Sequence, residues 1–277
     1  MASVKDIIVK PINATMANNF VKAHHYSGKV VPNSQLHFGC FLNGVLGGVM
    51  QFGPSMDKRK VCGLVKNTPF NDFLELNRMA FNELLPKNSE SRCISVAIRL
   101  IKKYYPNIKW IISFADGCQC GDGTIYRASG FKLTDIRENH NLCRLPSGET
   151  VHKMTLESNP TQKRKELSGL SYSELNNGKN DFMNYVKHVG GEIITGYQLR
   201  YIYFIDKSYE KFLTVPVLSF NMIDKMNARM YKGKAYKKDN ACLVQDKNAC
   251  VPVSDGGESP TDTHQVPQTN NNNAIQI

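Results

Sequence analysis

An aspartate at the end of one predicted strand and a tyrosine on the next predicted helix are the residues best placed for acid–base chemistry. Ile108–Phe114 is an apolar run of strand length, and Asp116 follows where the strand would leave a sheet. Gly123–Ser129 predicts a short helix that contains Tyr126. A carboxylate and a phenol can meet at the carboxyl edge of a sheet and move a proton there. The alternative is that Asp116 only caps the turn after its strand.

A second polar set opens the long helix predicted over Glu90–Tyr105. Asn88 or Ser89 would cap this helix, and Ser91 and Arg92 lie in its first turn. The free N–H groups of a helix N-terminus bind anions, and a hydroxyl and a guanidinium add to that site. Alternatively, Ser89 is only a cap and Arg92 is solvated.

Arg78 lies within the predicted strand Phe73–Phe81, which is rich in Leu and Phe. A buried arginine needs a partner, so Arg78 either pairs with Glu75 or Asp116 or faces a ligand.

His25 and Tyr26 follow a predicted helix and precede a loop. A lone histidine is often structural, but a His-Tyr-Ser-Gly run in a loop favours a functional role. The eight cysteines form no paired CxxC units, so reduced thiols are expected. Cys118, Cys120 and Cys143 are an alternative set of soft-metal ligands, although their spacing is not that of a zinc site.

The charge of the chain is distributed unevenly. The net charge is +11, and the segment from Asp239 to the end contributes −4, so residues 1–238 carry +15. This balance favours a polyanionic partner such as nucleic acid. One stretch holds six basic and no acidic residues, which are expected to contact DNA phosphates unless they form a solvated face: Lys225, Arg229, Lys232, Lys234, Lys237 and Lys238.

The elements that would position these residues alternate between strands and helices. Asn43-Gly44 joins two β-prone runs as a hairpin, and Pro106 ends the long helix. The predicted class is α/β, with a mixed sheet flanked by helices in a single domain. The strands are expected at Asp6–Ile12, Leu36–Leu42, Val45–Phe52, Phe73–Phe81, Ile108–Phe114, Leu133–Arg137, Glu149–Leu156 and Gln198–Ile205, with a helix over 13–24.

Two further segments complete the organisation. Residues 157–193 are polar and helix-prone, which indicates an insertion into the 1–238 domain. Residues 239–277 hold almost no large apolar residue and are predicted to be a disordered acidic and polar tail. No apolar run is long enough for a membrane span, and Met1–Lys10 does not read as a signal peptide.

Several motifs together resemble the Mom family of phage and prophage DNA-modification proteins. The resemblance extends from His24 to about Lys234, so it covers nearly all of the predicted folded body. The motifs, in chain order, are HHYSGKVVPNSQLHFGCFLNGVLGGVMQFGPS, ELNRM, PKNSESR, SFAD and GTIYRASGF.

This resemblance implies a fold like that of the GNAT acyltransferases. It also implies conversion of adenine in double-stranded DNA to an N6-carbamoylmethyl base, which blocks restriction endonucleases, in the cytoplasm of a bacterial host. The functional positions implied are His25, Tyr26, Arg78, Ser91, Asp116 and Tyr126. Asp116, Tyr126, Tyr26 and Ser91 would be catalytic, and Arg78, Ser89, Ser91 and Arg92 would bind the cofactor.

The resemblance implies acetyl-CoA or another acyl donor, although Lys87–Ser91 replaces the glycine-rich pyrophosphate loop of the superfamily. An iron ion is also implied for the family, and His25, Tyr26 and Asp116 are acceptable ligands for it. The alternative functions are a GNAT-like N-acyltransferase of a small amine or protein, and a DNA-binding protein without catalysis. The sequence leaves the oligomeric state open, a dimer included.

Overall fold

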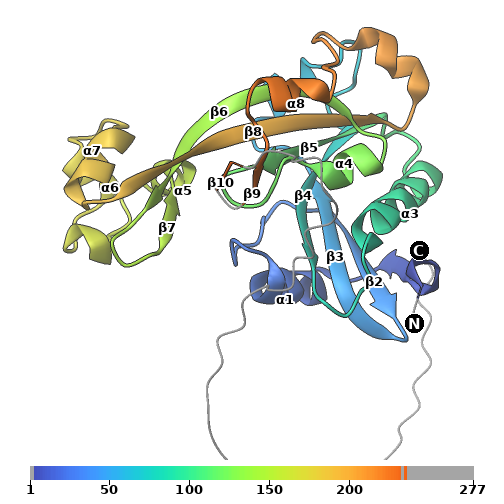
Figure 1. The fold of residues 1–277 in the computed structure, drawn as a ribbon, viewed down its shortest axis with the longest axis horizontal. Helices are drawn as coiled ribbons and strands as arrows, with labels where there is room; N and C mark the ends of the chain where they lie inside the picture. The colour runs from blue at the N-terminus through green and yellow to red at the C-terminus, as the bar shows by residue number, and fades with distance from the viewer. Residues whose placement is uncertain (1–2, 232–233, 236–277) are drawn as a thin grey trace, which may run out of the picture. The chain divides into compact units, whose positions relative to one another are not determined.

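The computed structural model describes residues 3–231 and 234–235 (Figure 1). Eight strands form one sheet in the order β1-β2-β3-β4-β5-β8-β6-β7. Every neighbouring pair in it is antiparallel except β4 and β5. The strands are β1 (Ile8–Pro11), β2 (Leu36–Leu42), β3 (Val45–Gly53), β4 (Phe73–Phe81), β5 (Trp110–Asp116), β6 (Lys132–Arg144), β7 (Thr150–His152) and β8 (Glu192–Phe204). The mixed α/β sheet predicted from the sequence is confirmed.

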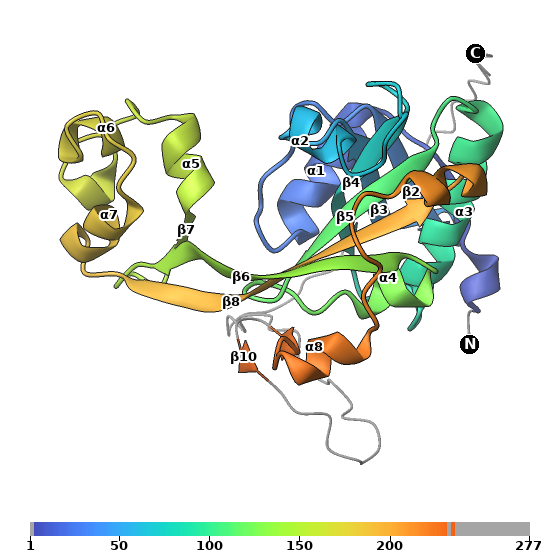
Figure 2. The same ribbon diagram turned by 90° about the horizontal axis from the view of Figure 1, so that it is seen from above.

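Helices cover both faces of this sheet (Figure 2). The α1/α2 face carries α1 (Ala14–His24) and α2 (Lys58–Cys62), and the α3/α4 face carries α3 (Ser89–Tyr104), α4 (Thr124–Ala128) and α8 (Asn221–Lys225). α1 buries Phe20 and Val21 against β3 and β4, whereas α3 buries its apolar side against the opposite face. A separate two-stranded sheet pairs β9 (Met230–Tyr231) with β10 (Lys234–Ala235).

β4 and β5 pair only at their beginnings. Hydrogen-bonded register runs from Phe73 opposite Trp110 to Glu75 opposite Ile112. Beyond that point β4 continues along β3 and β5 continues along β8, so the two parallel strands part. We call the space between 76–81 and 113–116 the strand gap. Between the pairs Gln51–Arg78 and Phe52–Leu76 the register shifts by one residue, with Asn77 the extra residue on β4, and this bulge adds local curvature beside the gap.

The insertion is a folded lobe with its own apolar cluster, built around side chains such as Leu156, Tyr172 and Tyr185. The lobe comprises α5 (Lys153–Ser158), which begins before the predicted insertion, the 3-10 turn Lys165–Leu167, α6 (Tyr172–Leu175) and α7 (Phe182–His188). Two other 3-10 turns lie outside it, at Val4–Asp6 and Lys207–Phe212. The strand predicted over Glu149–Leu156 is wrong in its second half, because the His152 side chain accepts from the Met154 N–H and starts a helix.

Residues 1–237 form one compact unit, and the predicted tail 239–277 lies outside the described residues. None of the helices in the described part combines the length and apolarity needed to cross a bilayer.

Candidate functional site

The predicted site residues line the strand gap, but they do so from two faces of the sheet. Successive strand side chains alternate between faces, and Trp110 and Ile112 pack with the segment that contains α2. Asp116 has the same parity and therefore points to the α1/α2 face, as does Glu75. Tyr126 packs in the cluster beneath α3. Asp116 and Tyr126 thus approach the gap from opposite sides, which the strand-tip pattern did not predict.

Arg78 holds the loop that carries His25 and Tyr26. Its Nε donates to the Lys29 carbonyl oxygen over 3.0 Å, and its Nη1 donates to the Asn77 carbonyl oxygen over 2.8 Å. Of the alternatives raised by the sequence, no ion pair joins Arg78 to Glu75 or Asp116 among the described residues. Arg78 therefore positions this loop over the gap by binding backbone atoms.

His25 is kept neutral and in one tautomer. Its Nδ1 accepts from the Ser27 backbone N–H over 3.1 Å, so the ring proton lies on Nε2. Burial, and then the nearby Arg78 charge, lower the pKa of His25 to about 4. The ring lies against that of Tyr26, with centroids 4.1 Å apart.

Tyr26 stands at the opening of the gap, with 55% of its surface exposed. The surrounding protein, followed by Cys120 and Asp116, raises the pKa of its phenol well above the ordinary value. Arg78 opposes this rise. The phenol therefore remains protonated at neutral pH and can donate a hydrogen bond or stack on a planar ligand.

Asp116 organises the turn after β5. Its Oδ1 accepts from the Cys118 backbone N–H (3.0 Å) and from Asn139 Nδ2 (3.2 Å), and its Oδ2 accepts from Gln119 Nε2 (3.0 Å). The turn-capping interpretation is thus part of what Asp116 does. The alternative thiol cluster does not form, because Cys143 packs in the lobe while Cys118 packs in a separate small cluster.

Tyr126 and Ser113 form the α3/α4 side of the gap. Tyr126 is 8% exposed, and burial raises the pKa of its phenol to about 12. The Ser113 hydroxyl adjoins this phenol and partly offsets the rise. Ser113 Oγ is fully buried, and no group in the described part of the chain meets it with good hydrogen-bond geometry. Apart from the adjoining Tyr126 phenol, this hydroxyl has no polar neighbour to bind among the described residues, so a ligand atom in the gap can hydrogen-bond with it.

Glu75 is a site residue that sequence reasoning used only as a partner for Arg78. It is the last residue of β4 paired with β5, and burial raises the pKa of its carboxyl. Hydrogen bonds with Ser55 and Asn77 oppose that rise. The signal in the sequence was an acidic residue inside an apolar strand.

The N-terminus of α3 forms a further polar site near the gap. Asn88 adopts a left-handed conformation (φ 67°) and its side chain caps nothing, so the first N–H groups of α3 stay open to an anion. The Ser89 hydroxyl is buried and donates to the Pro86 carbonyl, and Ser91 Oγ donates to the Asn88 carbonyl over 3.3 Å. Arg92 Nε is buried without a hydrogen-bond partner in the described residues. An anionic cofactor group fits this set.

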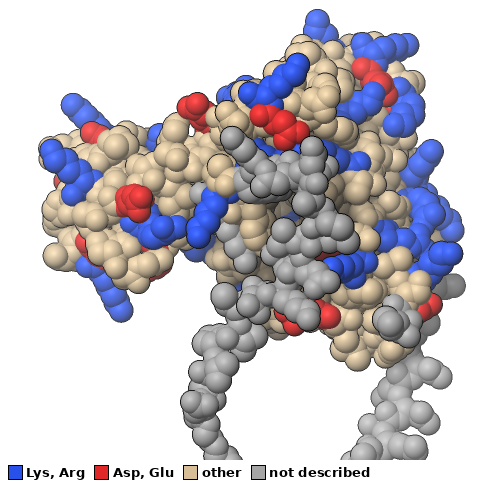
Figure 3. All heavy atoms as spheres, in the orientation of Figure 1, with Lys and Arg blue, Asp and Glu red and all other residues tan. Residues whose placement is uncertain are grey.

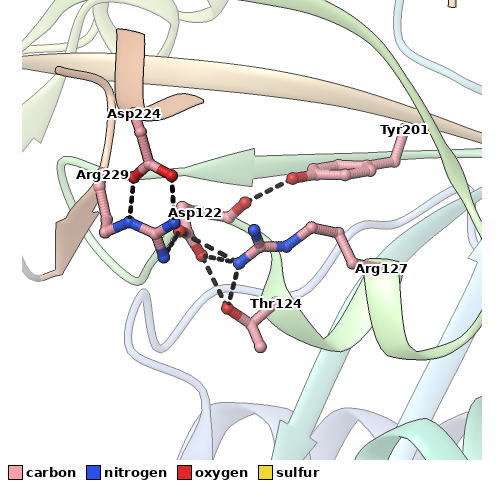
Figure 4. A network of polar contacts seen from close by, with 6 residues as sticks. All are labelled: Asp122, Thr124, Arg127, Tyr201, Asp224 and Arg229. Carbon is pink, nitrogen blue, oxygen red and sulfur yellow. Dashed lines mark hydrogen bonds and ion pairs between the residues drawn. The ribbon is translucent and has the colours of Figure 1, made fainter. Parts of the chain in front are cut away.

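A buried ion-pair network closes the α3/α4 side of the site (Figure 4). Asp122, 2% exposed, is bound by Arg127 Nη2 at 3.1 Å and by Arg229 Nη1 at 3.3 Å, and Arg229 also binds Asp224 through two nitrogens. The Tyr201 hydroxyl donates to the Asp122 carbonyl over 2.5 Å. The loop after β5 is thereby tied to the C-terminal segment.

This network changes the interpretation of the basic stretch. Arg229, predicted to contact DNA, instead links the buried carboxylate of Asp122 to the exposed carboxylate of Asp224. Lys225 and Lys234 are exposed on the α3/α4 side, whereas Lys232, Lys237 and Lys238 lie outside the described residues. Figure 3 views the face bearing α8 and shows basic side chains along its rim and on the lobe, mixed with acidic ones.

The residues implied for iron do not fit a metal in this conformation. A metal on His25 Nε2 would require the ring proton on Nδ1, which instead accepts the Ser27 N–H. Three of the Asp116 acceptor positions are taken. The described residues include no group of three His, Cys, Asp or Glu side chains suited to a metal ion.

Comparison with solved structures returns acetyltransferases. They include an IAA acetyltransferase from Bacillus cereus (10% identity, 72% of this chain and 99% of that one, TM-score 0.36) and the ribosomal-protein-S18-alanine N-acetyltransferase from Escherichia coli (9%, 72% and 94%, 0.37). These scores are too low for the acetyltransferases to inform the chemistry of this chain.

Sequence comparison is more specific. The chain is 37% identical over 153 residues to "Methylcarbamoylase mom" of Escherichia phage Mu, and the match covers 55% of this chain and 62% of that protein. The model of the Mom protein family matches residues 6–222, which include every residue of the strand gap. The chain therefore belongs to the Mom protein family.

Proposed function

We propose that this protein modifies adenine in double-stranded DNA at N6, adding a carbamoylmethyl group. Family membership and the name of the phage Mu relative support a transferase of this kind. The observation that carries the proposal is the two-sided strand gap. An acceptor half formed by Tyr26, Glu75 and Asp116 faces a donor half formed by Ser113 and Tyr126.

The acceptor half has the groups that an aromatic amine requires. The N6 lone pair is delocalised into the purine, so a new N–C bond needs a base to remove an N6 proton as the bond forms. Glu75 supplies that base in our proposal, because its pKa is raised and Asp116 is already held by three donors. Tyr26, exposed at the opening, can stack on the purine.

The donor half is suited to a phosphorylated acyl donor such as acetyl-CoA. Its phosphate would lie at the N-terminus of α3 with Ser91 and Arg92. Transfer of an acetyl group alone would give an amide at N6, so the N–CH2 bond and the amide nitrogen of a carbamoylmethyl product also require an oxidant and a nitrogen-donating co-substrate. Tyr126 is protonated at neutral pH and can hydrogen-bond a leaving or carbonyl oxygen or sulfur. We route no step through iron.

The consequence of such a modification would be protection from restriction. N6 of adenine is a hydrogen-bond donor in the major groove, where sequence-specific proteins read the base. A carbamoylmethyl group there would obstruct a restriction endonuclease, in the cytoplasm of the bacterial host.

The test is mass spectrometry of nucleosides from cells that express the chain. The expected result is a modified deoxyadenosine whose mass matches addition of a carbamoylmethyl group, absent with Glu75→Gln. Unmodified DNA alongside acylated small amines or proteins would instead support the N-acyltransferase alternative and reject the proposal.

A further inference from the structure

The two sides of the strand gap differ in access. On the α1/α2 face Tyr26 is 55% exposed, and the Lys29 that follows it is also exposed. On the other face Tyr126 is 8% exposed. Met230 of the C-terminal segment packs there so closely that a Cβ on Gly117 would lie 3.0 Å from it. In the described residues, the gap is therefore more accessible to a macromolecular substrate from the α1/α2 face than from the α3/α4 face.

We propose that duplex DNA docks on the α1/α2 face, with its phosphates on Arg59 and Lys60 and with Met56 filling the space left by the extruded adenine. This docking mode rests on the proposed function, since it assumes that adenine enters the gap beside Tyr26. It places the DNA on the opposite side of the sheet from Lys225 and Lys234.

The loop that bears Met56 borders the gap. Residues 54–57 connect β3 to α2, and Ser55 hydrogen-bonds Glu75 at the point where β4 and β5 part. The Pro54 carbonyl accepts from Asn77 Nδ2 (3.4 Å) and from Asn33 Nδ2 (3.5 Å), which lies on the loop after Tyr26. The loop is thus anchored both to β4 and to the segment that carries Tyr26.

Met56 has the exposure and chemistry of a wedge. At 67% exposed it is the most exposed large apolar side chain of the described residues. Enzymes that act on a paired base must extrude it, and apolar side chains commonly enter the stack that is opened. Methionine is flexible and polarizable, so it can pack between bases without a fixed shape.

The charge of this segment complements a duplex. Residues 54–71 contain four basic residues and one acidic residue, Asp57, whose carboxylate accepts from the Lys60 N–H. Lys58 is held by Asn71 at 2.7 Å and lies over the Phe70 ring. The side chains of Arg59 and Lys60 are exposed, and neither forms an ion pair with another described residue.

The first experiment locates the duplex. Binding of a short duplex is measured by fluorescence anisotropy over a salt series for Arg59→Gln/Lys60→Gln and for Lys225→Gln/Lys234→Gln. Both variants lose two charges, but from opposite faces. We expect the first pair to weaken binding and to flatten the slope of log affinity against log salt by ~1.8, at ~0.9 per phosphate contact, while the second pair stays near wild type. The reverse pattern would overturn the proposal.

The second experiment tests the wedge. Met56→Ala is compared with Met183→Ala, a similarly exposed methionine (62%) on α7 in the lobe, using a duplex with 2-aminopurine at the target position. We expect Met56→Ala to lose the fluorescence rise of the extruded base and to modify paired adenine about tenfold more slowly or worse. An adenine opposite an abasic site should restore its rate, because no partner base has to be displaced.

The outcomes separate docking from chemistry. Equal behaviour of the two methionine variants, or no rescue by the abasic site, would reject Met56 as the wedge. A further outcome is that the wild-type protein modifies no adenine while only the Arg59/Lys60 variant loses salt-dependent DNA binding. In that case the docking face would stand and the proposed function would fail.

Discussion

Individual residues in the strand gap are tuned by burial more than by ion pairing. The phenols of Tyr26 and Tyr126 and the carboxyl of Glu75 all have raised pKa values, chiefly because surrounding protein atoms displace water from each group, although Tyr26 keeps 55% of its surface exposed. The pKa of His25 is lowered by burial in the same way. These shifts keep the two phenols protonated and His25 uncharged at neutral pH, and they make the Glu75 carboxylate a stronger base than an exposed one.

The first prediction concerns the phenol of Tyr126. Tyr126→Phe should reduce adenine modification by about 100-fold or more, because it removes the donor beside Ser113. The ring packs in the core against Tyr201 and Phe131, and the variant keeps it, so the melting temperature should stay close to wild type.

Tyr172→Phe is the matched control for that variant. Tyr172 is fully buried in the lobe, and its hydroxyl has no hydrogen-bond partner among the described residues. Its removal should leave modification unchanged and stability equal or slightly higher. Similar activity losses in the two variants would show that Tyr126 has no special role.

The second prediction concerns His25 and pH. Its pKa is about 4 in the folded protein and 6.5 when unfolded, so between these values the unfolded chain binds more protons. The free energy of unfolding should therefore fall as pH decreases from 6.5 to 4, by at most ~3 kcal/mol from this group. His25→Gln should lack that component, as urea titrations across this pH range would show. If the free energy of unfolding changed with pH in the same way in the wild-type protein and in His25→Gln, the lowered pKa of His25 would be contradicted.

At the scale of elements, the loop after β5 depends on the C-terminal segment. Gly123 is left-handed (φ 78°), and a Cβ there would lie 2.4 Å from the Tyr201 ring, so this loop packs closely against Tyr201 of β8. Arg229 holds it from the other side through Asp122. Residue 229 lies beyond the part of the chain matched by the family model, so this contact adds to the elements that the model covers.

The third prediction follows from that network. Arg229→Gln should destabilise the protein by about 3 kcal/mol, because it leaves Asp122 buried with one fewer cation. Arg137→Gln is the control, since Arg137 pairs with Asp135 while 64% of its side chain is exposed, and it should cost less than about 0.5 kcal/mol. Chemical denaturation measures both, and equal losses would mean that the buried pair has no special weight.

At the scale of the molecule, charge is divided along the chain. The fourth prediction is that truncation after Lys238 leaves the melting temperature unchanged, since the removed segment offers almost no apolar surface to bury. The net charge rises from +11 to +15, so DNA affinity at low salt should rise or stay equal. Loss of cooperative unfolding in the truncated protein would refute the expectation of a disordered tail.

Much of the fold could be predicted from local patterns. Asn43-Gly44 forms the expected tight turn, with φ of 51° and 80°, and Asn13 caps α1. β6 and β8 are longer than predicted, and β8 begins at Glu192, within the end of the predicted insertion, instead of at Gln198. β-propensity depends on cross-strand neighbours, which the local sequence does not contain.

The candidate site, like the fold, could be predicted from the sequence only in part. Residue types, their order and the motifs determined the family and named Tyr26, Arg78, Asp116 and Tyr126. Which face of the sheet each one occupies, and the entry of Glu75 into the site, were decided by strand pairing between distant segments. Likewise, the sequence showed a basic C-terminal stretch, but only the tertiary structure placed Arg229 beside a buried aspartate. Charge and periodicity are local properties of a chain, whereas burial and partners arise when segments far apart pack together.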